Sequence, residues 1–227
     1  MTTTAQDLIG PAIASSVAND QGTSELANNP DELLGVLSRR IRQVYTMAAM
    51  PKGLGGMGKG YYFATSQTVV VASSPVALAE AAFRHSVTKN GGRVAVVSQQ
   101  DLDDARAEMP PAVVIEGNKL RTAGRTHDPV AGDQLLIRYT PLPLVLTSTA
   151  DYVGALVAGD PTSTVWPGWV GDPYLVAWLS RYLAIKAGDR DPQELQAVET
   201  DLKAAADLFS ATVGVDAARL VQDVEDT

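Results

Sequence analysis

The chain has 227 residues, a net charge of −8 at pH 7, 45% hydrophobic residues and no cysteine, which is enough for one large domain or two small ones. The absence of cysteine excludes disulfides and a thiolate nucleophile, and no apolar run approaches the roughly 20 residues that span a bilayer. The acidic balance argues against a protein that grips nucleic acid, because such binding needs a basic face.

Two helices are predicted in the first 51 residues. Residues 4–17 carry an apolar stripe, but Gly10-Pro11 falls inside it, so this helix is kinked or starts later. The second helix has a clearer start, because Asn29 suits the N-cap and Pro30 suits the first helical position. Its apolar face lies opposite a basic group that includes Arg40, and Pro51 is predicted to end it.

Residues 52–60 form a glycine-rich connector, which is predicted to be a hinge. Gly53–Lys59 has the G-x-x-x-x-G-K spacing of a phosphate-binding loop, but Gly60 stands where that loop has the Ser or Thr that holds Mg²⁺. A predicted helix precedes the segment, whereas a phosphate-binding loop follows a buried strand. A nucleotide-binding enzyme is therefore only an alternative hypothesis.

Residues 61–147 have the character of an inserted sheet. A β-branched run at Thr68–Val71 and the run Leu135–Tyr139 predict strands. Two hairpins are predicted, at Asn90-Gly91 and at Gly117-Asn118, because these dipeptides tolerate the positive φ angles of tight turns.

Two further helices are predicted after a linker that begins near residue 148. Asp172-Pro173 is predicted to open the first of them, and Gly188 to cap its end. The second begins with a capping box, Asp191-x-x-Glu194, and continues with apolar residues at three- and four-residue steps. The predicted fold class is α+β, a helical bundle formed by the N- and C-terminal helices with an inserted small antiparallel β-sheet.

The predicted organisation joins the two terminal helical pairs into one compact domain. Its parts are an N-terminal helical pair (1–51), a glycine-rich hinge (52–60), the β-sheet region (61–147), a linker with the C-terminal helical pair (148–212) and a C-terminal arm (213–227).

No catalytic, cofactor-binding or metal-binding residue is predicted. The chain has two histidines, His85 and His127, and neither belongs to a cluster with metal-ligand spacing. No serine lies in a Gly-x-Ser-x-Gly elbow. We therefore expect no enzymatic activity.

Two groups of apolar residues are candidate contact sites. Trp166 and Trp169 lie in a predicted loop, where aromatic side chains either fill the protein's own core or anchor a partner. Beyond Gly214, apolar and acidic residues are mixed in a short segment that is either a frayed terminus or an arm that becomes ordered in a neighbour's groove. The apolar residues of this segment are Val215, Leu220, Val221 and Val224.

The order of these features resembles the head-to-tail adaptor (connector) proteins of tailed double-stranded DNA bacteriophages. The resemblance rests on Thr-x-x-Asp-Leu-Ile at Thr4, on Gly-Asp-x-Leu-x-Ile-x-Tyr-x-Pro-x-Pro-Leu-x-Leu-Thr from Gly132, and on Leu-Val-x-x-Leu-x-x-Tyr-Leu-Ala from Leu175. It covers most of the chain as a pattern of elements. The chain departs from the pattern at residues 52–60 and at the alanine-rich Pro75–Ala82, which is ambiguous between helix and strand.

The resemblance implies a structural virion protein without cofactors, located in the neck between capsid and tail and assembled in the host cytoplasm. Copies would form a ring, commonly a dodecamer, that binds under the portal protein, extends the DNA channel and provides a docking platform for the downstream tail or nozzle protein. Double-stranded DNA would pass through an acidic lumen without specific binding, and no membrane partner is implied.

The resemblance also implies roles for particular residues. Val215, Leu220, Val221 and Val224 become candidates for the portal interface, and the loops at Asn90 and Asn118 become candidates for the tail interface. The alternative is another stopper or tail-completion protein of the virion, which would share the ring but not the portal contact.

Overall fold

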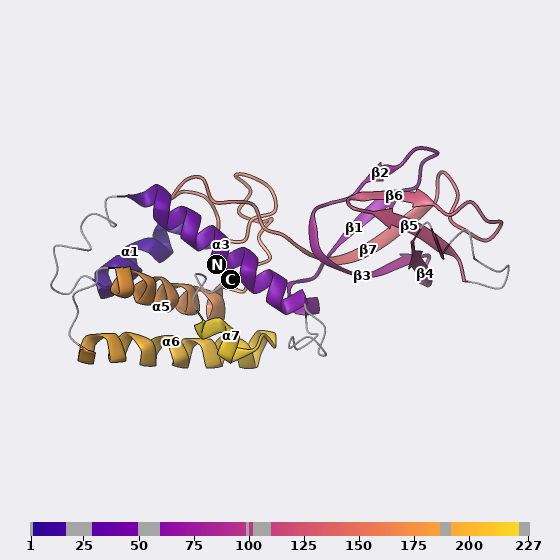
Figure 1. The fold of residues 1–227 in the computed structure, drawn as a ribbon. Coiled ribbons are helices and arrows are strands. Elements are labelled where there is room, and N and C mark those ends of the chain that lie inside the picture. Colours follow the sequence, from indigo (N-terminus) through magenta and orange to yellow (C-terminus); the bar gives the residue numbers. More distant parts are fainter. Residues whose placement is uncertain are drawn as a thin grey trace. The chain divides into compact units, whose positions relative to one another are not determined.

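The computed structural model describes residues 2–16, 29–49, 60–98, 100–101, 110–186 and 192–222. The chain forms two compact units (Figure 1), which we call the helical unit (residues 1–63 and 142–227) and the barrel unit (residues 64–141). Of the predicted glycine-rich hinge at 52–60, only Gly60 belongs to the described residues.

The negative net charge of the chain comes entirely from the helical unit. The helical unit contains 18 acidic and 10 basic residues, a difference of −8, whereas the barrel unit contains eight of each. The acidic balance is therefore a property of the helical unit, and the barrel unit is neutral overall.

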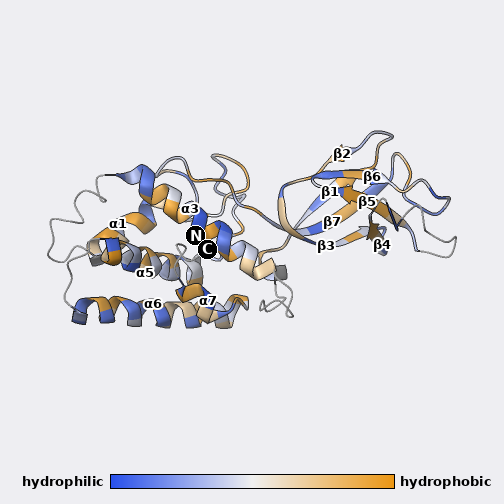
Figure 2. Ribbon diagram, in the orientation of Figure 1, coloured by the Kyte–Doolittle hydropathy of each residue, from blue (hydrophilic) through white to orange (hydrophobic). Residues whose placement is uncertain are grey.

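The helical unit is built around α5, which packs against both α1 and α6, while α7 packs against α6 (Figure 1). Hydrophobic and hydrophilic residues recur along α3 and α6, as expected for helices with one face on a core (Figure 2). The elements described in this unit are α1 (Ala5–Ser16), α3 (Pro30–Ala49), the 3-10 helix η2 (Gly60–Phe63), α5 (Gly168–Lys186), α6 (Pro192–Val213) and α7 (Ala217–Val221).

Of two predicted helix starts, the structure confirms one and contradicts the other. The start of α3 at Pro30 is confirmed, and two acidic residues occupy its first turn. The start of α5 at Asp172-Pro173 is wrong, because α5 begins at Gly168 and Pro173 lies inside it. The backbone N–H groups of Val170 and Gly171 both donate to the carbonyl of Pro167, and this turn begins the helix before the Asp-Pro signal.

An aromatic cluster fills the centre of the helical unit. The rings of Tyr174 and Phe209 stack with centroids 5.1 Å apart, and the rings of Tyr45 and Phe63 lie 4.7 Å apart. Trp166, from the irregular segment that precedes α5, joins them at 5.5 Å from Phe209. The Tyr45 hydroxyl has no hydrogen-bond partner among the described residues, and burial raises its pKa.

The barrel unit is a seven-stranded sheet in the order β1-β7-β3-β4-β5-β6-β2, which curls into a nearly closed barrel (Figure 1). All neighbouring strands are antiparallel except β4 and β5, which are parallel. The strands are β1 (Thr65–Val70), β2 (Val76–Ala77), β3 (Ala81–Lys89), β4 (Gly92–Val97), β5 (Ala112–Glu116), β6 (Lys119–Thr122) and β7 (Gln134–Pro141).

Alternation along the strands gives the barrel its own core. In β7, Leu135 and Ile137 are buried while Leu136 between them is exposed, because successive side chains of a strand point to opposite faces. The open edges of the sheet are linked by a side chain, since the N–H of Ala79, just after β2, donates to Gln67 Oε1 of β1 at 3.0 Å.

The predicted fold class, a helical bundle with a small antiparallel sheet, is wrong. The sheet has seven strands with mixed pairing and forms a unit with its own core. The helical unit is not a simple bundle either, because residues 142–167 contribute Leu146, Val153 and Trp166 to its core. Neither the parallel β4–β5 pair nor the two-residue β2, which lies in the ambiguous Pro75–Ala82, has a local sequence signal.

Both predicted hairpins are confirmed. β3 and β4 meet at the pair Lys89–Gly92, with φ angles of 51° at Asn90 and 80° at Gly91. β5 and β6 are joined through Gly117, whose φ angle is 56°. Only glycine and a few short polar residues adopt such angles readily, which is why the sequence predicted both turns.

Candidate functional site

The segment from Leu142 to Pro167 contains no helix and no strand beyond a single bridge to Thr4, yet hydrogen bonds hold it in place. The N–H of Ala5 donates to the carbonyl of Asp151, and the N–H of Val153 donates to the carbonyl of Thr3, both at 2.9 Å. The N–H of Leu146 donates to the Ser38 hydroxyl at 2.8 Å. The segment is therefore a fixed part of the helical unit.

Side chains within the segment also close its turns. The Asp151 carboxylate accepts from the N–H of Thr147 at 2.7 Å and of Ser148 at 2.9 Å. These hydrogen bonds, above all the one from the Thr147 N–H, hold the pKa of Asp151 below its usual value. The Ser163 hydroxyl accepts from the N–H of Val157 at 3.1 Å. Each of these turns is thus stabilised by a side chain of the segment itself.

This fixed segment exposes apolar side chains. Leu144, Val145 and Val157 are 40%, 51% and 56% exposed. The N–H of Leu144 donates to the carbonyl of Ala155. Leu144, Val145, Tyr152 and Ala155 line part of a groove of about 70 Å³, whose lining also includes the polar Thr147 and Asp151. We call these four residues the loop groove. Its volume suits one apolar side chain of a partner better than a small-molecule ligand.

The two tryptophans have different positions. Trp166 is buried in the core, whereas Trp169, in the first turn of α5, is 69% exposed. Trp166 Nε1 donates to Asp172 Oδ1 at 2.9 Å, and the Thr3 hydroxyl donates to Asp172 Oδ2. Burial raises the pKa of Asp172, while these two hydrogen bonds oppose that rise. Of the two predicted anchors, Trp169 is the one open to a partner.

Two glycines make room for the Trp166 side chain. A Cβ added at Gly171 would lie 2.4 Å from Trp166 Cε2, and one added at Gly154 would lie 2.7 Å from Trp166 Cβ. Gly154 also has a φ angle of 68°, which disfavours other residues. Sequence reasoning missed both glycines, because nothing in their neighbourhood along the chain distinguishes them from ordinary turn glycines.

The candidate portal-interface residues belong largely to the core of the chain itself. Val215 and Leu220 are 1% and 0% exposed, and Val221 packs against the same core. Val224 lies outside the described residues. In this conformation Val215 and Leu220 are not accessible to a partner.

A buried arginine ties this C-terminal segment to the helices. Arg40 of α3 is fully buried, although the sequence pattern predicted it on the polar face. Its Nε donates to the Tyr174 hydroxyl at 2.6 Å and its Nη2 donates to the carbonyl of Leu220 at the end of α7. The guanidinium also lies 4.9 Å from the centroid of the Trp178 ring. Through these hydrogen bonds, Arg40 joins α7 to α3 and α5. Its positive charge at the C-terminal end of α7 is also electrostatically favourable.

The candidate tail-interface residues lie in the two hairpin turns of the barrel unit. Asn90 is exposed, and Asn118 is exposed but its Oδ1 accepts from Arg84 Nη2 at 3.0 Å. The tail-interface role of these turns stays a prediction.

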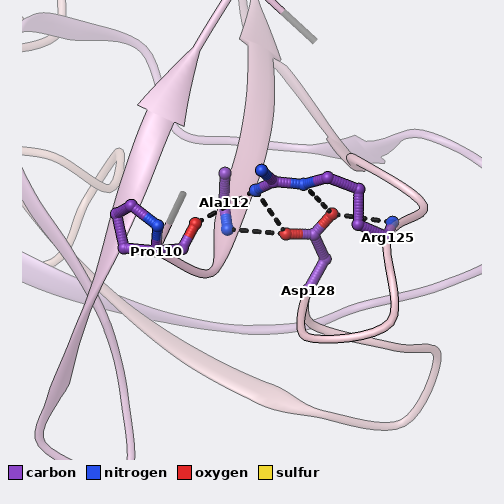
Figure 3. A network of polar contacts seen from close by, with 4 residues as sticks. All are labelled: Pro110, Ala112, Arg125 and Asp128. Atoms are coloured by element: carbon purple, nitrogen blue, oxygen red, sulfur yellow. Dashed lines mark hydrogen bonds and ion pairs between the residues drawn. The ribbon is translucent and has the colours of Figure 1, made fainter. Parts of the chain in front are cut away.

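A network of polar contacts in the barrel unit joins a loop to the start of β5 (Figure 3). Asp128, which is buried, accepts from Arg125 Nη2 at 2.8 Å, from Arg125 Nε at 3.0 Å and from the N–H of Ala112 at 2.9 Å. Arg125 also donates to the carbonyl of Pro110 at 3.0 Å. Burial tends to raise the pKa of Asp128, but its hydrogen bonds with Arg125 and Ala112 prevail and lower it.

We expect Asp128→Asn to destabilise the protein by about 1–3 kcal/mol at neutral pH, because it leaves buried donors poorly paired. The lowered pKa means that the carboxylate stabilises the fold above its unfolded-state value of about 3.9, and that this stabilisation is lost as the pH falls through the folded-state value. Urea unfolding from pH 7 to about pH 3 should therefore show the difference from wild type shrinking with acidity. Glu116→Gln, at an exposed ion pair with Arg121, is the control; a difference independent of pH would contradict the prediction.

The described residues contain no group of three or more His, Asp or Glu placed to hold a metal ion. His85 Nε2 lies 2.7 Å from Thr140 Oγ1, and burial together with the charge of Arg138 lowers its pKa. Asp128, which neighbours His127 in sequence, binds Arg125. The Gly53–Lys59 motif lies outside the described residues.

Within the part of the chain that the structure describes, no helix combines the length and the apolar character needed to cross a membrane. No family model matches the sequence, and no curated protein matches it.

Proposed function

We propose that this protein is a non-enzymatic structural component of a virion, a ring-forming head-to-tail adaptor that binds under the portal protein and provides a docking platform for the tail. The proposal starts from the resemblance of the patterns at Thr4, Gly132 and Leu175 to such adaptors. The observation that carries it is the exposure of apolar side chains on the helical unit, both at the loop groove of the fixed segment and at Trp169.

A surface of this kind suits protein association more than chemistry. Hydrogen bonds already hold the segment from Leu142 to Pro167 in place, so binding a partner would cost little additional ordering. Exposed tryptophan is among the residues that contribute most when buried in an interface. A ring would repeat the same modest contact in every copy, which raises the overall strength of binding.

The charge distribution supports the same role. The helical unit carries the whole net charge of −8, and an acidic lining would let double-stranded DNA pass without specific binding. In this proposal the protein assembles in the host cytoplasm and resides in the neck of the virion. The second candidate is a stopper or tail-completion protein, favoured by the burial of Val215 and Leu220, which leaves the portal contact without an accessible arm.

The test is electron microscopy of the full chain mixed with the assembled portal protein that is encoded near it. A ring of this protein stacked coaxially on the portal would support the adaptor. A ring that forms but never joins a properly assembled portal would favour the stopper or tail-completion protein, and the absence of any ring would contradict both.

In the same assay, Trp169→Ala is expected to weaken ring or portal association at least about tenfold, because truncating a central interface tryptophan costs about 2 kcal/mol or more. Its thermal unfolding should match wild type, since the side chain is 69% exposed. Leu208→Ala, at another exposed apolar position, on α6, is the matched control. Equal association of the two variants would remove Trp169 from the interface.

A further inference from the structure

Two neighbouring strands of the barrel unit separate after a short stretch of pairing. The pairing of β3 with β4 is limited to three residues on each strand, Val87–Lys89 of β3 with Gly92–Val94 of β4. Beyond this point β3 pairs with β7 on its other side, and β4 pairs with β5 on its other side. Among the described residues, no ladder joins residues 81–86 of β3 to residues 95–97 of β4. Within the described residues, each strand therefore has an edge that faces the other strand and has no ladder partner there.

A cavity of about 430 Å³ occupies this separation. Its lining consists of four consecutive residues of β3 (84–87), four consecutive residues of β4 (93–96) and Pro110. Successive side chains of a strand point to opposite faces, so a cavity that touches consecutive residues on both strands lies between their edges. We call it the β3–β4 cleft.

A local irregularity accompanies the cleft. The pairing of β3 with β7 shifts register between Arg84 and Ser86, and such bulges bend a strand and increase its twist. The bulge thus lies in the part of β3 that separates from β4. Free strand edges with unpaired N–H and C=O groups are templates for an added strand.

The charged residues of the cleft are of one sign. Arg84 and Arg93 line it together with the apolar Val87, Val94 and Val96, and none of its lining residues within the described part of the chain is acidic. Arg93 is exposed and makes no ion pair with any residue that the structure describes. Val96 is 51% exposed. An occupant that alternates carboxylate and apolar side chains would match both features.

We propose that the β3–β4 cleft binds an extended, acidic segment of another protein chain by strand addition. Backbone hydrogen bonds to the free edges supply the attachment, Arg93 pairs with a carboxylate of the segment, and an apolar side chain of the segment packs against Val96. A nucleic acid is disfavoured, because the barrel unit has equal numbers of acidic and basic residues and because a strand edge pairs with a peptide backbone. This inference does not depend on the proposed adaptor role.

The experiment is hydrogen exchange with mass spectrometry on the full chain, with and without an excess of the probe acetyl-Glu-Val-Glu-Val-Glu-Val-amide. We expect slower exchange in peptides that cover residues 81–87 and 93–98, and no change elsewhere in the barrel unit. The same probe with alternate backbone nitrogens methylated should lose this protection, because it lacks half of its N–H donors.

The variant Arg93→Glu should weaken binding of the probe by about tenfold, as expected for loss of a charge-assisted pair and introduction of a repulsion. Lys119→Glu makes the same change of charge at an exposed site of the barrel unit outside the cleft lining and should bind like wild type. Since Arg93 is exposed, both variants should fold, and Arg93→Ala provides an intermediate with no added negative charge.

Three results would overturn the inference. One is no protection by the probe at concentrations that saturate any site tighter than millimolar. Another is equal protection by acetyl-Lys-Val-Lys-Val-Lys-Val-amide or by the methylated probe, which would leave no role for the charges or for strand addition. The last is protection of the same residues by a single-stranded oligonucleotide that displaces the probe, which would assign the cleft to nucleic acid.

Discussion

Replacing Trp166 by alanine is expected to lower the free energy of unfolding by about 3–5 kcal/mol, the range for truncating a large core aromatic residue. Trp166 is packed among the aromatic rings of the helical unit, with Phe209 at 5.5 Å and Phe63 at 6.3 Å. Its removal also takes away the hydrogen bond from Nε1 to Asp172, a carboxylate that is half-buried. The loss therefore combines a cavity with a weakened polar contact.

Urea unfolding followed by circular dichroism measures this effect, and Trp169→Ala serves as the control three residues away. The control should change the free energy of unfolding by less than about 0.5 kcal/mol, because surface substitutions rarely exceed this. Gly171→Ala should resemble the Trp166 variant in direction, since its Cβ would lie 2.4 Å from the indole. Equal stability of the Trp166 and Trp169 variants would show that the burial of Trp166 does not stabilise the unit.

Replacing Arg40 by alanine is expected to destabilise the protein by about 3 kcal/mol. The change removes the donor to the Leu220 carbonyl and the partner of the Tyr174 hydroxyl, and it leaves a cavity beneath Trp178. Arg40→Met should cost less, because its side chain fills much of the volume and avoids the cost of burying a charge. The Tyr174 hydroxyl also donates to the Leu220 carbonyl at 3.1 Å, and we expect this hydrogen bond to remain in both variants.

The readout specific to this contact is amide exchange in residues 214–222, which should accelerate in Arg40→Ala more than exchange in α1. Arg39→Ala, at the exposed neighbouring position, is the matched control and should leave both rates unchanged. Uniform acceleration across the helical unit would mean that Arg40 supports the core in general and not the attachment of α7. If the proposed portal contact uses Val215 and Leu220, α7 must leave the core, and Arg40→Ala should then favour that contact.

Short-range signals in the sequence determined several elements by themselves. The Asn-Pro-Asp-Glu run predicted the start of α3 at Pro30, because Pro and acidic residues suit the first turn of a helix. The Asn90-Gly91 and Gly117-Asn118 dipeptides predicted both hairpins, because their turns need positive φ angles. The run Leu135–Tyr139 predicted a strand, which the structure has as β7, but its three consecutive apolar residues did not show that Leu136 would be the exposed one. Each of these features depends on residues a few positions apart.

Which side chains are buried, and which strands pair, depends on contacts between residues far apart in the sequence. The candidate sites depend on the same contacts. Trp166 is buried and Trp169 exposed because Gly154 and Gly171 leave room for one indole at one place in the core. Arg40 is inside because Tyr174 and the end of α7, far along the chain, satisfy its guanidinium. The parallel pairing of β4 with β5, and the cleft between β3 and β4, likewise arise from strand partners that no local pattern specifies. Burial and strand pairing are properties of the assembled tertiary structure, since the groups that satisfy a side chain or a strand edge come together only when the chain folds.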